Sequence, residues 1–452
     1  MSDNNILKIL RNEVSYFENI LRRRDYFYDI NQLHTYSDYN RQISPRLIKD
    51  YWAKFIQYAK NKNNPCDIDF YIHIPFCQSK CVYCSYPSQT ARDRREIDRY
   101  VDYLIENMCF FSDTFSQIKF RNLYVGGGTP SILNSKQLDK VLTNLFRYFS
   151  FCGDSQKTAE CNPGSTRNSR LSLLKHFGFN RVSFGVQTLN AKVLKIHKRD
   201  YQDYASIKKA IGLVKENGFR DISVDLIAGL AGDSPNGFTK SFSEIAKLRP
   251  YNIVVYGLMP PNDGYLRKYF KMSRADYFQK HYPSMISRAL KIMRVLSRKF
   301  GYVADSFDPA RFHWGFRHKE HLDSSFSQDY SGEYAGCTFG LGTFSRSYIH
   351  GMLEYRQVKQ PRHFEFDSKI YEGRILRKKE AMIKFIINHL ALESKVPQKI
   401  FEAVFGTSIF VAFPYAIYAL KRLGKIKIFD DYICFYFDKP EEKYIYALFF
   451  YR

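Results

Sequence analysis

The feature that most constrains the fold is a repeated alternation of strand and helix patterns between residues 68 and 259. Short apolar segments alternate with amphipathic segments of about 10–15 residues, which is typical of parallel βα units. Six units are fewer than the eight of a closed (β/α)8 barrel, so the sheet is either an open doubly wound one or an incomplete barrel. The expected strands are 69–74, 120–128, 157–161, 181–187, 221–229 and 252–259; the expected helices are 94–111, 135–149, 170–178, 203–217 and 236–248.

The unusual residues of this region follow the strands. Three cysteines come after the first strand, three glycines after the second, Glu160 ends the third and Gln187 ends the fourth. In barrels of parallel strands, functional groups lie at the carboxyl ends of the strands. The sequence therefore predicts one site at that face.

The rest of the chain has a different pattern. The three helices and the hairpin at the C-terminal end suggest a winged-helix-like domain. The expected domains are a helical arm (1–66), the α/β core (67–300), a Gly- and aromatic-rich segment on the substrate side (301–371) and the winged-helix-like domain (372–452). A long basic helix is expected over 278–300, and the C-terminal helices over 373–390, 397–404 and 413–424.

The cysteines lie in the stretch FCQSKCVYCSY, residues 76–86, with the spacing C-x3-C-x2-C. In a helical turn or tight loop this spacing brings Cys77, Cys81 and Cys84 to one side. Thiolates bind zinc and iron–sulfur clusters. His73 could complete a Cys3His zinc site, although strand alternation places it with Tyr71 on a face directed away from the loop. Alternatively, three thiolates hold a [4Fe–4S] cluster and leave one iron open for a ligand.

This spacing after the first strand resembles the signature of radical S-adenosylmethionine (SAM) enzymes. The surrounding motifs resemble the oxygen-independent coproporphyrinogen III oxidase-like branch over roughly residues 68–452. They are FYIHIPFC (70–77), GGGTP (126–130), AECNPGS (159–165), RVSFGVQT (181–188), HKRD (197–200) and DLIAGLAG (225–232). The resemblance implies an incomplete (β/α)6 TIM-type radical SAM barrel with the N-terminal arm and the winged-helix-like domain.

The resemblance also implies a role for each site residue. Cys77, Cys81 and Cys84 would ligate a [4Fe–4S] cluster whose open iron binds SAM, and a reducing partner such as flavodoxin or ferredoxin would supply the electron. SAM cleavage would give methionine and a 5′-deoxyadenosyl radical. The residues implied in SAM binding are Tyr83, Gly126, Gly127, Gly128, Thr129, Glu160, Gln187, Arg199 and Asp225, with Tyr71 beside the sulfonium.

The chemistry of these side chains suits SAM. Bare glycine backbone allows a ligand to approach closely, and the guanidinium of Arg199 can bind the methionyl carboxylate with two hydrogen bonds. A carboxylate such as Glu160 can bind the amine or the ribose hydroxyls. Asp225 lies in an apolar strand and would need a partner if it is buried; a strand-end cap is the alternative.

One position departs from the oxidase pattern. Oxidases carry a fourth cysteine two residues after the third, where this chain has Tyr86. The same scaffold serves methyltransferases and cyclopropanases that hold two SAM molecules, and heme-binding chaperones. The segment HTYSDYN (34–40) resembles the arm of oxidases and two-SAM methyltransferases. We therefore expect a two-SAM methyl or methylene transferase, with coproporphyrinogen III dehydrogenase-type oxidative decarboxylation and heme binding without turnover as alternatives.

The charge of the chain bears on its partners. Lys and Arg number 69 against 45 Asp and Glu, a net charge of +24, which favours an anionic partner. We expect a small-molecule or carrier-bound anionic substrate rather than nucleic acid, although Lys421, Arg422, Lys425 and Lys427 could contact phosphates. No apolar run of about 20 residues and no signal peptide is visible, so a cytoplasmic monomer is expected, with cysteines that serve as thiols or ligands.

Overall fold

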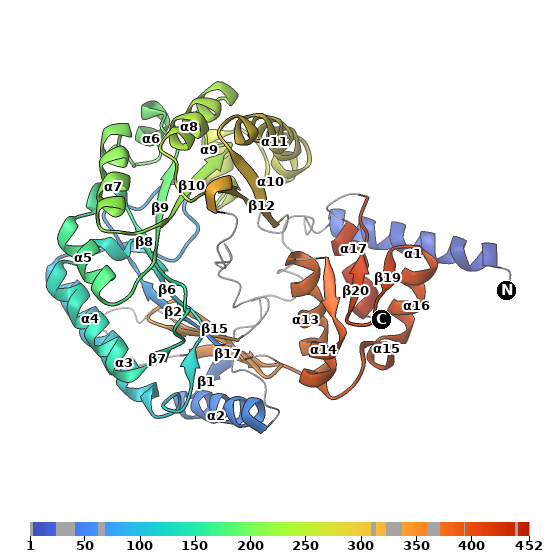
Figure 1. The fold of residues 1–452 in the computed structure, drawn as a ribbon. Coiled ribbons are helices and arrows are strands. Elements are labelled where there is room, and N and C mark those ends of the chain that lie inside the picture. Colours follow the sequence, from blue (N-terminus) through green and yellow to red (C-terminus); the bar gives the residue numbers. More distant parts are fainter. Residues whose placement is uncertain are drawn as a thin grey trace.

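The computed structural model describes nine segments of the chain. They are residues 3–23, 41–61, 68–308, 313–321, 337–349, 351–358, 371–392, 394–438 and 442–451. Two hydrophobic cores organise them, one under a large curved sheet and one in a smaller domain at the C-terminal end of the chain. Figure 1 shows the sheet and its helices as an open ring with the smaller domain beside the opening.

Six parallel strands follow one another in chain order around the sheet and confirm the expected βα units. Because neighbours in the sheet are also neighbours in the chain, the fold is an incomplete barrel and not a doubly wound sheet. The strands are β2 (Ile68–Ile74), β6 (Leu123–Gly127), β8 (Lys157–Cys161), β9 (Arg181–Gln187), β10 (Asp221–Ala228) and β11 (Asn252–Gly257). The intervening helices are α3 (Arg94–Ser112), α4 (Ser135–Tyr148), α5 (Asn168–His176), α6 (Ala191–Ile196), α7 (Tyr204–Glu216) and α8 (Pro235–Lys247).

Further strands extend both edges of the sheet, and the sequence did not predict them. The stretch 301–371, expected only as a Gly- and aromatic-rich segment, contributes strands that pair largely antiparallel. Beyond β11 come β13 (His313–His318) and β12 (Tyr302–Asp308); beyond β2 come β14 (Cys337–Leu341), β15 (Arg346–Ile349), β16 (Leu353–Gln357), β17 (Tyr371–Ile375) and β1 (Arg41–Ile43). The edges β1 and β12 do not pair, so the barrel stays open.

Two expected helices begin later than predicted. The helix expected over 373–390 is preceded by β17 and runs as α13 (Lys378–Leu392). The helix expected over 278–300 is α11 (Tyr282–Lys299), preceded by a π-helical turn at Tyr277–His281 and by α9 (Asp263–Tyr269) and α10 (Arg274–Asp276). None of the helices in the described segments is both long and apolar enough to cross a bilayer.

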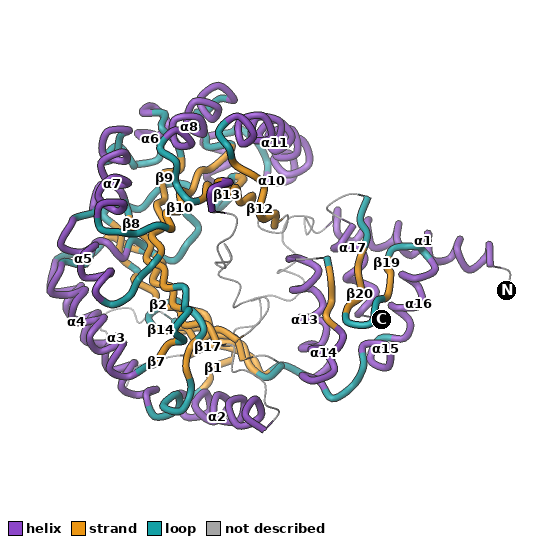
Figure 2. Tube along the Cα trace, in the orientation of Figure 1, coloured by secondary structure: helices purple, strands orange, loops and turns teal. Residues whose placement is uncertain are grey.

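The helices cover only the outer face of the curved sheet, as Figure 2 shows. An aromatic core packs there, in which Phe70 of β2 lies 5.2 Å from Phe339 of β14 between ring centroids. Trp52 of α2 (Pro45–Asn61) is fully buried against Phe339 and donates to the Tyr355 hydroxyl at 2.7 Å. Burying an aromatic side chain of this size stabilises the fold by about 1.5–3 kcal/mol. Because side chains alternate along a strand, the residues between these face the inside of the barrel.

The C-terminal domain agrees with the winged-helix-like expectation. Along the chain, a helix and a strand are followed by three helices, two strands and a last helix. The three strands form a small sheet in the order β18-β20-β19. The elements are α13, β18 (Lys395–Pro397), α14 (Gln398–Phe405), α15 (Ile409–Ala412), α16 (Pro414–Arg422), β19 (Ile426–Ile428), β20 (Tyr432–Phe435) and α17 (Glu442–Leu448).

The N-terminal arm is not one structural unit. Helix α1 (Asp3–Arg23) buries Leu10 and Phe17 in the core of the C-terminal domain, with Phe17 5.1 Å from Phe449 between ring centroids. Helix α2 packs on the barrel. The segment 34–40, in which we expected an arm over the site, lies outside the described residues.

Candidate functional site

The cysteine loop is fixed at both ends where β2 leaves the barrel. The short strand β3 (Phe76–Cys77) pairs with β4 (Gln89–Thr90), so residues 78–88 form a closed loop. A turn inside it, in which the Cys84 N–H donates to the Cys81 carbonyl at 3.1 Å, brings the second and third thiols to the same part of the loop. All three cysteines are free thiols, and burial raises the pKa of Cys77 and Cys84.

Cationic and hydroxyl donors surround these sulfurs. Arg199 Nη1 donates to Cys81 Sγ at 3.3 Å, and Thr129 Oγ1 donates to Cys77 Sγ at 3.6 Å. Lys80 Nζ donates to Ser88 Oγ at 2.8 Å and to the carbonyl of Tyr86 within the loop. A set of three thiols with two cations beside it suits thiolates that carry negative charge onto a metal cluster.

The loop also packs onto the opposite part of the barrel mouth. Cys81 and Tyr83 share an apolar cluster with residues that follow β9, β10 and β11. The His197 ring lies 5.3 Å from Tyr83 and 6.1 Å from Tyr265 between ring centroids, and its Nε2 bonds the Ala231 carbonyl at 3.1 Å. The loop therefore extends from the end of β2 across the carboxyl ends of the other strands to residues that follow β9, β10 and β11.

The three glycines after β6 make room for the protein itself. A Cβ on Gly128 would lie 2.6 Å from the Phe76 carbonyl oxygen and 3.0 Å from Cys77 Sγ. A Cβ on Gly127, whose φ is +111°, would lie 2.7 Å from the His73 ring, and one on Gly126 would lie 2.9 Å from the Glu160 carboxylate. The bare backbone expected to admit a ligand thus lets β6 pass directly under the cysteine loop.

Two carboxyl groups face each other across the inner wall. Glu160 accepts from the Tyr124 hydroxyl at 2.7 Å and from the Gly127 N–H at 3.1 Å, while Asp225 accepts from Ser183 Oγ at 3.3 Å. Burial raises the pKa of both carboxyl groups, and the charge of Glu160 helps raise the pKa of Asp225 to about 7. This pair is suited to a cationic ligand, because a positive charge would relieve their repulsion.

Gln187 carries backbone strain and an unsatisfied acceptor. It lies in the left-handed region at φ 71°, where β9 bulges against β10. Its side-chain Oε1 is buried without a hydrogen-bond partner. A non-glycine residue in this region costs about 1–3 kcal/mol, and buried acceptors normally find donors. The unpartnered Oε1 could therefore accept a hydrogen bond from a ligand.

His73 does not act as a spare metal ligand. Its Nδ1 bonds the Tyr71 hydroxyl at 2.9 Å and its Nε2 bonds the Pro87 carbonyl at 3.0 Å, so both ring nitrogens are engaged. Burial lowers the pKa of His73 to about 4. The expectation that His73 points away from the cysteine loop is wrong, since Pro87 belongs to that loop. In the described part of the chain, no three His, Cys, Asp or Glu side chains, the loop cysteines included, already stand close enough to hold a metal ion, so the three thiols would have to draw together on binding a cluster.

Arg199 differs from the expected open fork. It is 7% exposed, and its Nη2 donates to the carbonyl of Gly185 and to Gln202 Oε1. Of its nitrogens, Nε is buried without a partner. The guanidinium therefore joins the cysteine loop to β9. Because Nη1 and Nη2 already donate to protein groups, Nε is the nitrogen left without a partner for the expected contact with a carboxylate.

The structure brings the expected residues to the barrel mouth together with others that the sequence did not single out. Lys80, Tyr124 and His197 were not singled out; Tyr124 could have been, because strand alternation puts it on the inner face with Gly126. Tyr86 is 67% exposed at the position of the fourth oxidase cysteine. The second SAM molecule of a two-SAM transferase is expected to lie along residues 325–348, and part of this segment is outside the described residues. Around the barrel mouth the structure brings together Tyr71, Cys77, Cys81, Tyr83, Cys84, Gly126, Gly127, Gly128, Thr129, Glu160, Gln187, Arg199 and Asp225.

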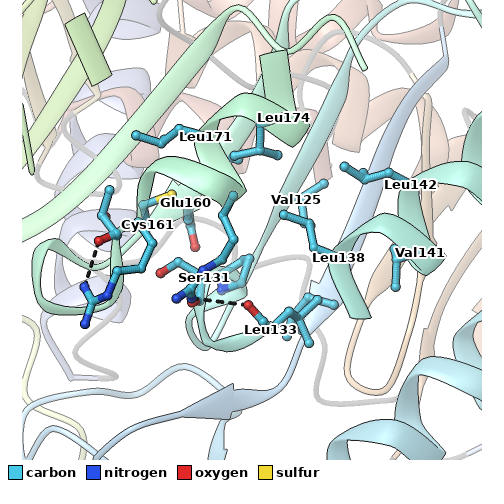
Figure 3. A pocket seen from close by; sticks show the side chains of 16 residues that line it. Val125, Ser131, Leu133, Leu138, Val141, Leu142, Glu160, Cys161, Leu171 and Leu174 are labelled. Atoms are coloured by element: carbon cyan, nitrogen blue, oxygen red, sulfur yellow. Dashed lines mark hydrogen bonds between the residues drawn. The ribbon is translucent and has the colours of Figure 1, made fainter. Parts of the chain in front are cut away.

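A separate cavity lies between the sheet and helices α4 and α5. Figure 3 shows its mostly apolar lining, with Leu138 and Leu142 on one side and Leu171 and Leu174 on another. Its volume is about 20 Å³, enough for one water molecule. Because it faces the helices and not the barrel interior, we regard it as a packing gap and not as part of the site.

The comparisons with known proteins agree with this geometry. Residues 71–245 match the radical SAM superfamily. The oxygen-independent coproporphyrinogen III oxidase of Escherichia coli (strain K12) is 31% identical over 189 residues, 42% of this chain and 41% of that relative. The heme chaperone HemW of Lactococcus lactis is 26% identical over 304 residues, 65% of this chain and 73% of the relative.

A solved structure extends the likeness to nearly the whole fold. Coproporphyrinogen III oxidase (HemN) from Escherichia coli superposes with a TM-score of 0.72 at 20% identity, covering 94% of this chain and 98% of the other. By sequence, this chain spans only about two fifths of the oxidase relative. Residues 71–245 are therefore a radical SAM domain, and the chain is similar to the branch that includes the oxygen-independent coproporphyrinogen III oxidases and the heme chaperone HemW.

Proposed function

We propose that this protein is a radical SAM enzyme that carries out oxidative decarboxylation of a tetrapyrrole propionate, in the manner of a coproporphyrinogen III oxidase. The observation that carries the proposal is the arrangement at the barrel mouth. Three free thiols with cations beside them lie above a buried carboxyl pair and the unsatisfied acceptor of Gln187.

The donor set fits a [4Fe–4S] cluster and SAM. Cys77, Cys81 and Cys84 would hold the cluster, and Arg199 and Lys80 would balance its negative charge. When bound, cluster and SAM supply a 5′-deoxyadenosyl radical for hydrogen abstraction. The thiols must lose their protons on binding the cluster, which the two nearby cations favour.

The inner wall supports the orientation of SAM. Glu160 and Asp225 would attract its positively charged amine and sulfonium end, and Gln187 Oε1 would accept a hydrogen bond from the amine or a ribose hydroxyl. Tyr71 lies on the same face of β2 as His73, which holds its hydroxyl in place. The loop that closes over the mouth would limit access of water to the reacting atoms.

The relatives support some of the expected reactions more than others. Those compared above are oxidases and heme chaperones, which favours the alternatives over a two-SAM methyltransferase. Tyr86 points into solvent and its replacement of a cysteine leaves the three-thiol loop intact. The net charge of +24 suits a substrate with several carboxylates.

Heme binding without turnover is the second candidate. It is favoured by the extent of the alignments, because the HemW relatives match 65% and 75% of this chain and the oxidases 42% and 45%. The same cysteine loop would then hold a cluster in a protein that binds heme.

One anaerobic experiment distinguishes these functions. Reconstituted protein is incubated with methyl-deuterated SAM, a small reductant and coproporphyrinogen III, with Cys81→Ala as the control. We expect about four irons per chain, 5′-deoxyadenosine, methionine and vinyl products, all absent from the control. S-adenosylhomocysteine and deuterium in 5′-deoxyadenosine would instead indicate methyl transfer. Tight heme binding without SAM cleavage would indicate the chaperone.

A further inference from the structure

Six exposed cations lie near the cysteine loop, on two helices that contribute residues to its apolar cluster. They lie on α6 with the turn after it and on α9 with the turn after it, and we call them the basic rim: Lys192, Lys195, Lys198, Arg267, Lys268 and Lys271. Within the described segments, none of the six forms an ion pair. Such a charged surface, left without counter-charges, is available to an anionic partner.

The two helices of the rim pack directly on the cysteine loop. Val193 of α6 and Tyr265 of α9 lie in the same apolar cluster as Cys81 and Tyr83, with Cys84 packed against it. The His197 ring, which follows α6, stands between Tyr83 and Tyr265. A charged group bound on the rim would therefore be one layer of side chains away from the thiols. In Figure 1, α6 and α9 both lie in the upper part of the ring, next to α8.

Acidic residues do little to neutralise the rim. In the stretches 191–200 and 263–274 the only acidic residues are Asp200 and Asp263. Asp263 already faces Arg274 at 3.7 Å. The rim therefore keeps an excess of positive charge beside the site.

A second basic surface offers a comparison within the same chain. Helix α11 exposes Arg288, Lys291, Arg294 and Arg298 and contains no acidic residue. It packs on α8 and β12 and has no residue in the apolar cluster of the cysteine loop. The two surfaces have similar charge, and they differ in their distance from the thiols.

We propose that the basic rim is the docking surface for an acidic electron-donor protein of the flavodoxin or ferredoxin class. This rests on the proposed function, because the rim would serve the cluster held by the neighbouring thiols. One electron would pass from the reduced donor to the cluster held by Cys77, Cys81 and Cys84, and no atom would be transferred. Electron-transfer complexes are small and transient, and complementary charge raises their association rate about 10–10³-fold at low salt.

The test compares two variants with the same change in charge. The rim variant is Lys192→Glu/Lys195→Glu/Arg267→Glu/Lys268→Glu, and the matched control is Arg288→Glu/Lys291→Glu/Arg294→Glu/Arg298→Glu. Each protein is loaded with the cluster and mixed in a stopped-flow instrument with a reduced, purified acidic flavodoxin. The loss of absorbance at about 400 nm gives the rate of cluster reduction. Photoreduced 5-deazariboflavin, a small uncharged reductant, measures reduction without docking.

We expect the rim variant to lose at least about 10-fold in the rate with flavodoxin at low salt and to lose most of its salt dependence. The control should stay within about 2-fold of wild type, and all three proteins should react equally with 5-deazariboflavin. Equal rates with flavodoxin in all three, or an equal loss in both variants, would overturn the proposal. A further variant carries Gln at the same four positions. If 5-deazariboflavin reduces this variant slowly, the substitutions disturb the cluster itself and not the docking of a partner, and the proposal is overturned. Failure of the wild type to take up iron would instead contradict the proposed function.

Discussion

At the scale of single residues, burial and then the charge of Glu160 make Asp225 harder to ionise. Both are enclosed by the barrel wall, and the negative charge of Glu160 acts directly on Asp225. In the folded protein without ligand, Asp225 therefore holds its proton to about pH 7, whereas the unfolded chain releases it near the usual pKa of 3.8. This makes the protein's stability depend on pH.

Replacing Asp225 by Asn should remove that dependence. A raised folded pKa contributes stability that is complete below the unfolded pKa and is lost as pH rises through about 7. The stability of the cluster-free Asp225→Asn variant relative to wild type should therefore increase by roughly 3 kcal/mol between about pH 5 and pH 8. Urea unfolding at each pH measures it, with the exposed Asp200→Asn as control. A constant difference across this range would contradict the raised pKa.

A substitution at Gln187 should change the stability of the fold and the affinity for SAM in opposite directions. The Gln187→Gly variant relieves the left-handed backbone at φ 71° and should stabilise the cluster-free protein by about 1 kcal/mol. It also removes the buried Oε1 that lacks a partner, so SAM affinity of the cluster-loaded protein should fall about 10-fold, as expected for a lost hydrogen bond. Thermal unfolding and equilibrium dialysis with labelled SAM measure the two effects. Unchanged SAM affinity would show that this acceptor does not contact the ligand.

Much of the site could be predicted at this scale because its chemistry is local in sequence. The spacing of the cysteines and the placing of Glu160 and Gln187 at strand ends needed no tertiary information. The partners of His73 and the contacts of Arg199 with Gly185 and Cys81 depend on residues that only the folded chain brings together. The sequence therefore predicted which residues belong to the site better than it predicted what each one contacts.

At the scale of elements, the end of β6 and the cysteine loop fit together only because glycine lies between them. The Gly128→Ala variant would place its Cβ 2.6 Å from the Phe76 carbonyl oxygen, a backbone atom that cannot rotate away. We expect the loop to shift and the bound iron to fall to less than half. In Gly153→Ala, the matched control, a Cβ meets nothing within 4 Å, so iron content should be unchanged. Iron analysis with circular dichroism as a check on folding measures this. Normal iron content in Gly128→Ala would contradict the fit.

The parallel strands could be predicted and the added antiparallel ones could not, for a physical reason. Each βα unit is a local pattern of apolar strand and amphipathic helix. The strand β17 was instead predicted as the start of a helix, because the sequence after it has helical periodicity. Its β structure comes from pairing with β16 and with β1, more than 300 residues away. Strand formation depends on such neighbours more than on intrinsic preference.

At the scale of the whole molecule, the C-terminal domain is joined to the barrel through a buried ion cluster. Glu354 of β16 is 1% exposed and faces two cations, Arg374 of β17 at 3.5 Å and Lys384 of α13. The Lys384 ammonium also lies 4.3 Å from the ring centroid of Tyr348, which belongs to the core of the C-terminal domain. The sequence indicated a separate C-terminal domain, but these contacts, and the packing of α1 on it, join residues far apart in the chain.

Removing the charge of Glu354 should therefore weaken the molecule as a whole. The Glu354→Gln variant leaves two cations close together in a buried site, and breaking such a group by loss of one partner costs about 3–5 kcal/mol. Chemical denaturation of the cluster-free protein measures the loss. The charge-neutral double variant Glu354→Gln/Lys384→Met should recover at least half of it, because it also removes one of the uncompensated cations. The exposed pair Arg249 and Glu320 provides the control, since Glu320→Gln should change stability by less than about 1 kcal/mol. If Glu354→Gln costs no more than Glu320→Gln, the buried cluster does not hold the C-terminal domain to the barrel, and the apolar contacts of Tyr348 and α13 must do so.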